Sequence, residues 1–144
     1  MNPAELTGLQ LIEGMFDGTF PRASIMDTFP MSFGEVRSGY VRFLARADRR
    51  HLNPMGGVHG GFAATVLDSV TGCAVHTMLE AGVGYGTVDL NIKMLKPVPR
   101  DVELIAEGHV LHMSRSLGVS EGTLKTAEGT LLAHGMASCF VIRR

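Results

Sequence analysis

Residues 53–75 read NPMGGVHGGFAATVLDSVTGCAV, and the second half of this stretch decides the fold. From Phe62 to Leu79 nearly all residues apart from Asp68 are apolar, small or weakly polar, so no polar stripe marks a side that faces solvent. A helix of this composition is normally buried. Asp68 lies in the middle of it. Because an isolated buried carboxylate is costly, we expect Asp68 to be paired, protonated or functional.

The segments around this helix predict an α+β fold. Residues 4–16 have apolar side chains at helical spacing, and the following Pro- and Gly-containing stretch predicts a loop that lines a ligand site. Alternating apolar and polar side chains predict strands over residues 36–48, 86–96, 101–113, 116–126 and 130–142. One long apolar helix followed by a run of strands favours an antiparallel sheet with the helix on one face. We expect a single domain, 1–144.

Composition excludes several classes of function. Thirteen Lys and Arg residues against fourteen Asp and Glu give a net charge of -1, and the basic residues are scattered, so nucleic acid is not an expected partner. Cys73 and Cys139 lie in apolar segments and are expected to be free thiols of a cytoplasmic protein. No secretory signal or membrane span is expected. The six histidines form no Cys/His cluster, so we expect no metal site.

Two sequence motifs resemble catalytic signatures without the context that these signatures need. Residues 118–122, GVSEG, match the G-x-S-x-G pattern, which requires a strand, a sharp turn and a helix. Here the strand pattern continues on both sides, so Ser120 is not favoured as a nucleophile. Residues 82–86, GVGYG, precede a strand rather than joining a strand to a helix, and predict a turn.

The start of the apolar helix offers a place for a polarised carbonyl. The first N–H groups of a helix are unpaired and lie at the positive end of its dipole, so Gly60 and Gly61 are natural donors to an oxyanion. If the helix begins near His59, Asp68 lies roughly 13 Å along it. A reacting atom must lie about 3 Å from both groups. We therefore predict a homodimer in which two antiparallel helices place Asp68 of each protomer beside the helix start of the other.

Asn53, the His59-Gly60-Gly61 run and Asp68 resemble, in identity and spacing, the motif of hotdog-fold acyl-CoA thioesterases of the PaaI-like, phenylacetate-catabolism type. The resemblance covers about residues 36–142 and leaves 1–35 as an N-terminal helix and loop extension. It implies a long central helix wrapped by a curved antiparallel sheet, dimers joined edge to edge, and often dimers of dimers. It also implies no cofactor apart from the coenzyme A that is part of the substrate.

The resemblance assigns roles to the motif residues. Asp68 corresponds to the general base or nucleophile that acts on a thioester, and Gly60 or Gly61 to the backbone donor that holds its carbonyl. Asn53 corresponds to a side chain that orients the water or acyl group from the opposite subunit. His59 corresponds to the histidine beside the thioester.

Further positions follow less directly. Thr87 falls where relatives carry a Ser or Thr that positions the attacking water. Coenzyme A is expected along the surface near Lys96, Pro97, Ser114, Arg115 and Ser116, where the arginine can pair with a phosphate.

Structural roles remain alternatives for the same residues. Asp68 forms a core ion pair with His76 in one alternative, and Asn53 is a turn residue in another. In the remaining alternatives His59 is an ordinary residue at the helix start, Thr87 an ordinary strand residue and Arg115 a solvated turn residue.

Three functions are left open at this stage. The first is hydrolysis of an acyl or aroyl thioester of coenzyme A. The second is hydration or dehydration of an acyl thioester, against which the spacing from His59-Gly60-Gly61 to Asp68 argues. The third is acyl-CoA binding without catalysis, against which the presence of Asp68 argues.

Overall fold

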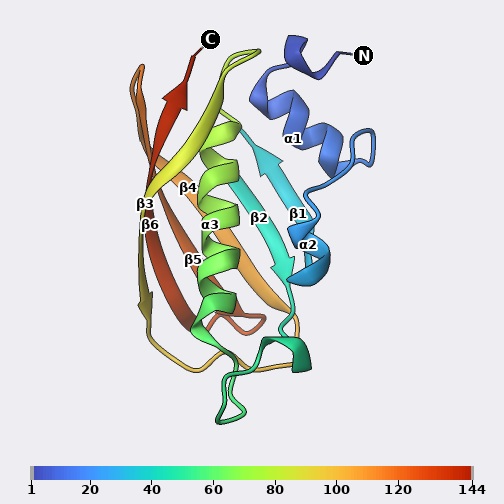
Figure 1. Cartoon of the computed structure of the whole chain (residues 1–144), viewed down its shortest axis with the longest axis vertical. Helices are drawn as coiled ribbons and strands as arrows, with labels where there is room; N and C mark the ends of the chain where they lie inside the picture. The colour runs from blue at the N-terminus through green and yellow to red at the C-terminus, as the bar shows by residue number, and fades with distance from the viewer. Residues whose placement is uncertain (1, 144) are drawn as a thin grey trace.

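The structure is a computed structural model that describes residues 2–143, and its sheet wraps one long helix. The elements in chain order are η1 (Pro3–Glu5), α1 (Gly8–Phe16), α2 (Ile25–Thr28), β1 (Met31–Arg37), β2 (Tyr40–Ala45), η2 (Arg49–His51), α3 (Gly60–His76), β3 (Gly84–Met94), β4 (Leu104–Met113), β5 (Leu117–Thr126) and β6 (Leu131–Ile142). All strand pairs are antiparallel, in the order β1-β2-β4-β5-β6-β3. The sheet curves around α3, while α1 and α2 lie beside β1 (Figure 1). The predicted α+β hotdog fold is confirmed.

The core lies between α3 and the concave face of the sheet. The buried side chains of α3 recur at helical spacing and include Phe62, Val66, Leu67 and Val70, each at most 1% exposed. They pack against strand residues such as Phe43 of β2. Burying side chains of this size contributes about 1.5–3 kcal/mol each. This apolar face therefore fixes α3 against the sheet.

The prediction that α3 is buried on all sides is wrong for the single chain. On the side away from the sheet Asp68 is exposed, and Ala64, Thr65, Ser69 and Cys73 are only half-buried. These residues are small or weakly polar, so their composition does not distinguish this side from the core side. Although α3 is largely apolar, no helix within residues 2–143 has both the length and the apolar character needed to cross a bilayer.

The region before α3 differs from the predicted loop and single strand. The predicted loop contains α2 and most of β1, and the strand expected over residues 36–48 is a hairpin of β1 and β2. The chain turns at Gly39, which has φ +79°. The pairing of β1 with β2 shifts between Phe33 and Glu35, at Gly34. This irregularity, and Pro30 directly before the strand, hid β1 in the sequence pattern.

The four strands after α3 begin and end within three residues of the predicted segments. β4, β5 and β6 pair in chain order as a meander, and β3 pairs with the other side of β6. Ser120 lies in the middle of β5 with its hydroxyl buried and without a hydrogen-bond partner in the described part of the chain. It is not on the strand–turn–helix elbow of a serine hydrolase, as predicted.

Gly108 of β4 allows α3 to lie directly on the sheet. A Cβ atom at this position would lie 2.2 Å from the carbonyl oxygen of Val70. Because the obstacle is helix backbone, we expect Gly108→Ala to lower the free energy of unfolding by about 2 kcal/mol, measured by urea denaturation. Gly84→Ala is the matched control, since no atom lies within 4 Å of its added Cβ. Equal urea midpoints for the two variants would contradict this close packing of α3 on β4.

Candidate active site

Asp68 lies on the exposed side of α3, at a cavity of about 190 Å³ that it shares with Thr87. Its carboxylate forms no ion pair and no side-chain hydrogen bond with any residue in the range 2–143. The alternative in which it pairs with His76 is therefore wrong for the single chain. His76 instead packs its ring 5.3 Å from that of Tyr85, and burial lowers its pKa. The Asp68 carboxylate is left free to act on a ligand.

The groups around Asp68 stay neutral at physiological pH. Burial, with a smaller contribution from the Asp68 charge, raises the pKa of the Cys73 thiol to about 12. Burial also raises the pKa of Tyr85 well above its ordinary value, with a small contribution from Asp68. The pKa of Cys139 is also raised, because burial raises it more than the hydrogen bond with Thr87 lowers it. Of residues 2–143, Asp68 is the one charged residue that lines the cavity.

Thr87 reaches this cavity because β3 carries a bulge. Thr87 pairs with Cys139 and Asp89 pairs with Ser138, so Val88 is the extra residue. Bulges of this kind redirect neighbouring side chains. The Thr87 hydroxyl lies 3.7 Å from the sulfur of Cys139. The structure thus brings Asp68 and Thr87 together, and the positioning of water by Thr87 stays a prediction.

The start of α3 offers one free backbone donor rather than two. His59 is the N-cap, and its Nδ1 atom accepts a hydrogen bond of 2.7 Å from the N–H of Gly61. Since Nδ1 is the acceptor, a neutral His59 carries its proton on Nε2. Within residues 2–143 the N–H of Gly60 has no hydrogen-bond partner. Gly60 is therefore better placed than Gly61 to hold a carbonyl.

Asn53 stabilises the turn that leads into α3. Its side-chain oxygen accepts hydrogen bonds from the N–H groups of Met55, at 2.9 Å, and Gly57, at 3.2 Å. These contacts correspond to the alternative of a turn residue. Only the side-chain NH₂ group of Asn53 is left for a ligand, and the orienting role from the opposite subunit stays a prediction.

The residues predicted to bind coenzyme A fall into two separate places. Lys96 and Pro97 line a cavity of about 250 Å³ together with Gly60. The turn Ser114–Ser116 lies at the other end of the sheet, where β5 and β6 pair through Leu117 and Phe140. The cavity at Lys96 and Pro97 adjoins Ala133 of β6. Ala133 is seven residues from Phe140, or roughly 23 Å along the strand. Contrary to expectation, one chain does not bring these two groups together.

Sequence reasoning missed most of the apolar lining of the site. Ala23, Ile25 and Met26 of the N-terminal region form one wall of the Asp68 cavity, and Phe43 and Tyr85 line it from the sheet. A second cavity, of about 380 Å³, adjoins His59 and Gly61 and is lined by aromatic rings including Phe29, His51 and Phe62. The only signal in the sequence was the length of the loop before β1, which was expected to line a ligand site.

Comparison with known proteins identifies related sequences. The family model described as Thioesterase superfamily matches residues 55–133. A Halobacterium salinarum protein named as an esterase is 38% identical over 96 residues, which cover 61% of this chain and 62% of that protein. Acyl-coenzyme A thioesterase 13 of Mus musculus is 30% identical over 91 residues, which cover 62% of this chain and 64% of that protein. The matched region thus spans less than two thirds of the length of these curated relatives.

Solved structures share the fold over most of the chain. A phenylacetic acid degradation-related protein from Ralstonia eutropha superposes with a TM-score of 0.82 and 28% identity, covering 89% of this chain and 97% of that one. A thioesterase protein from Streptococcus pneumoniae, solved with coenzyme A, gives a TM-score of 0.71 and 25% identity. That match covers 77% of this chain and 87% of the other.

Proposed function

Because this chain belongs to the thioesterase superfamily, we propose that it is an acyl-CoA thioesterase, which hydrolyses an acyl or aroyl thioester to the free acid and coenzyme A. The observation that carries the proposal is the Asp68 carboxylate, which has no partner within residues 2–143 and shares a mostly apolar cavity with Thr87. The names of the mouse relative and of the coenzyme A complex from Streptococcus pneumoniae support the choice of substrate.

The proposed site is shared between two protomers. α3 begins at Gly60, and Asp68 lies eight residues further on, roughly 12 Å along the helix axis. One chain therefore cannot present both groups to one carbonyl. In a two-fold dimer with antiparallel α3 helices, Gly60 of one protomer faces Asp68 of its partner. The exposed side of α3 consists of small residues, which allow two helices to approach closely. Two such dimers can pair further, as the resemblance implies.

The proposed reaction needs only one acid and one backbone donor. The N–H of Gly60 donates to the thioester oxygen and stabilises the negative charge that develops there, which is worth about 3 kcal/mol. Asp68 takes a proton from water held by Thr87, and the hydroxide oxygen bonds to the carbonyl carbon. When the C–S bond breaks, the proton on Asp68 passes to the departing sulfur. If Asp68 acts instead as the nucleophile, its oxygen bonds to the carbonyl carbon, the C–S bond breaks, and the coenzyme A thiolate leaves. Water then cleaves the resulting anhydride to the free acid and the Asp68 carboxylate, and the thiolate takes the proton that this step releases.

Release of free thiol from a panel of acyl-CoA compounds tests this function. The panel contains acetyl-, hexanoyl-, decanoyl-, benzoyl- and phenylacetyl-CoA, and a thiol-specific chromogenic reagent follows the product. We expect turnover of at least one of them. Binding without thiol release would favour a non-catalytic acyl-CoA-binding protein. Crotonyl-CoA, an enoyl thioester, is assayed beside the panel, and loss of its absorbance without thiol release would favour a hydratase.

A further inference from the structure

The composition of the Asp68 cavity distinguishes between the parts of a thioester substrate. Its lining combines the Asp68 carboxylate and three side chains with a hydroxyl, those of Ser69, Tyr85 and Thr87, with the mainly apolar side chains of Ala23, Ile25, Met26, Phe43 and Cys73. Its volume, about 190 Å³, is below the roughly 300–1,000 Å³ typical of pockets that enclose a whole drug-sized ligand. Coenzyme A is larger than such a ligand and highly charged. The cavity therefore suits the acyl part of the substrate.

The charge of the cavity adds a second restriction. Among the described residues, Asp68 is the one charged side chain in the lining that this chain supplies, and no Lys, Arg or His of the same chain lines it. A second carboxylate at the end of an acyl chain would enter an apolar space beside a like charge, with no cation from the protomer that supplies Asp68. Desolvation and repulsion both oppose this arrangement. The acyl group that fits is therefore uncharged.

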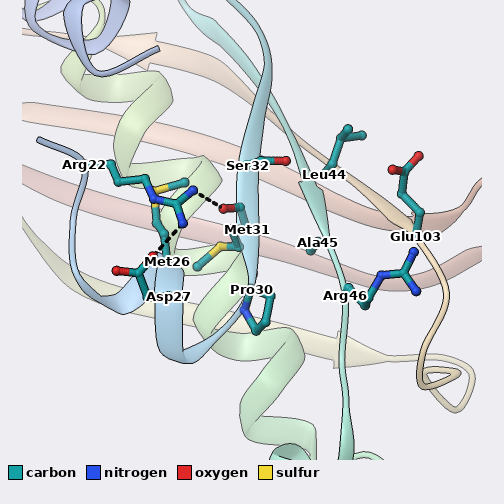
Figure 2. A pocket seen from close by; sticks show the side chains of 10 residues that line it. All are labelled: Arg22, Met26, Asp27, Pro30, Met31, Ser32, Leu44, Ala45, Arg46 and Glu103. Carbon is teal, nitrogen blue, oxygen red and sulfur yellow. Dashed lines mark hydrogen bonds and ion pairs between the residues drawn. The ribbon is translucent and has the colours of Figure 1, made fainter. Parts of the chain in front are cut away.

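The wall opposite α3 is held in place by contacts within the N-terminal region. Figure 2 shows Arg22 reaching both Asp27 of α2 and the backbone of Met31 in β1, at 2.5 Å and 2.9 Å. Met26 is 4% exposed and belongs to the hydrophobic core. Its neighbour Ile25 lines the cavity but is 43% exposed. Arg22 and Met26 thus anchor α2, while Ile25 can change in size without disturbing the core.

This wall belongs to a different part of the chain from the acid. Ile25 and Met26 precede the region matched by the family model, residues 55–133, whereas Asp68 and Thr87 lie within it. The part of the cavity wall that α2 supplies therefore lies outside the matched region that contains Asp68 and Thr87.

We propose, on the basis of the proposed function, that the cavity beside Asp68 holds the acyl group of the substrate. In this arrangement Ile25 of α2 sets the size of the largest acyl group accepted. Uncharged acyl groups are preferred to anionic ones. Ile25 is then a specificity-determining residue, since it bounds the space next to the reacting carbonyl. It takes no part in bond making.

The test compares kcat/KM for butyryl-, hexanoyl-, octanoyl-, decanoyl- and succinyl-CoA in the wild type, Ile25→Ala and Ile25→Trp. In Ile25→Trp we expect the ratio of kcat/KM for the longest accepted acyl-CoA to kcat/KM for butyryl-CoA to fall at least about tenfold. The reason is that the larger side chain removes space for one methylene group or more, and a methylene group is worth about tenfold or more in a hydrophobic pocket. Ile25→Ala should shift the optimum towards a longer group. Wild type should prefer butyryl-CoA to succinyl-CoA, which has a similar length, by at least about tenfold.

Ile142→Ala is the matched control, because Ile142 is 48% exposed and is not among the residues that line the cavity. It should keep the wild-type order of substrates. If both Ile25 variants hydrolyse thioesters with the wild-type order, the assignment of Ile25 is overturned while the proposed function stands. Equal use of succinyl- and butyryl-CoA would overturn the preference for uncharged groups. If the wild type releases thiol only from benzoyl- or phenylacetyl-CoA, the proposed function stands and this assignment of aliphatic chain length is overturned, whereas release from no compound of either panel overturns both.

Discussion

Replacing Asp68 with asparagine is expected to lower kcat for thioester hydrolysis by at least about 100-fold, the lower end of the range for removing a general base. Asparagine keeps the shape of the side chain but can neither take a proton nor attack a carbonyl. Because the carboxylate has no partner within residues 2–143 and is exposed in the single chain, the free energy of unfolding should change by less than about 0.5 kcal/mol. Thiol release at saturating acyl-CoA and urea denaturation measure the two effects.

Asp89→Asn provides a control for the same chemical change. Asp89 is exposed on β3, next to the bulge, but is not among the residues that line the Asp68 cavity. This variant should keep kcat within about twofold of the wild type, as expected for a residue outside the chemistry. An Asp68→Asn protein that retained more than a tenth of the wild-type kcat would remove Asp68 from the reaction.

Replacing Gly60 with proline is expected to lower kcat about 10²- to 10³-fold, the usual effect of removing one oxyanion donor. Proline has no backbone N–H, so the substitution deletes the proposed donor itself. Gly60 is the first residue of α3, a position that favours proline. The preceding residue, His59, has φ -65° and ψ 139°, which a following proline permits. The helix should therefore form as before.

Gly60→Ala separates the loss of the donor from the added bulk. Alanine keeps the N–H, and its Cβ would meet only the end of the Met94 side chain, 2.7 Å from the sulfur. Methionine is flexible, so this contact can be relieved. Thiol-release kinetics should show a much smaller loss for Gly60→Ala than for Gly60→Pro. Equal losses in the two variants would mean that the Gly60 N–H does not hold the carbonyl.

The fold could be predicted largely from periodicity. Strands β3 to β6 alternate apolar and polar residues over ten or more positions, and α3 contains no proline that would interrupt it. Signals of this length survive local irregularities. β1 was missed because it has only seven residues, Gly34 lies in the middle of it, and Pro30 directly precedes it. Its existence depends on pairing with β2, which is a tertiary contact.

Helix geometry predicted the site only where its residues lie on one element, and Thr87 of β3 was predicted only from the family resemblance. Gly60 and Asp68 could be related because they lie on the same helix, whose rise per residue is constant. The position of Ile25 beside Asp68 depends on how α2 packs, which no local pattern encodes. The exposure of Asp68 was mispredicted because small residues such as Ala64 and Ser69 suit either a core or a helix–helix contact. The hydrogen bond from the Gly61 N–H to the His59 side chain could not be predicted, because it depends on the conformation of that side chain.

The central claim is that Asp68 of one protomer acts together with Gly60 of its partner. Co-expression of Asp68→Asn and Gly60→Pro chains tests it most directly, because a mixed dimer then contains one site with both groups intact and one site with neither. Random pairing is expected to restore about a quarter of the wild-type thioesterase activity, since half of the dimers are mixed and each of these has one intact site. If the co-expressed chains are no more active than either variant alone, the two groups do not meet across a dimer and the shared site is contradicted.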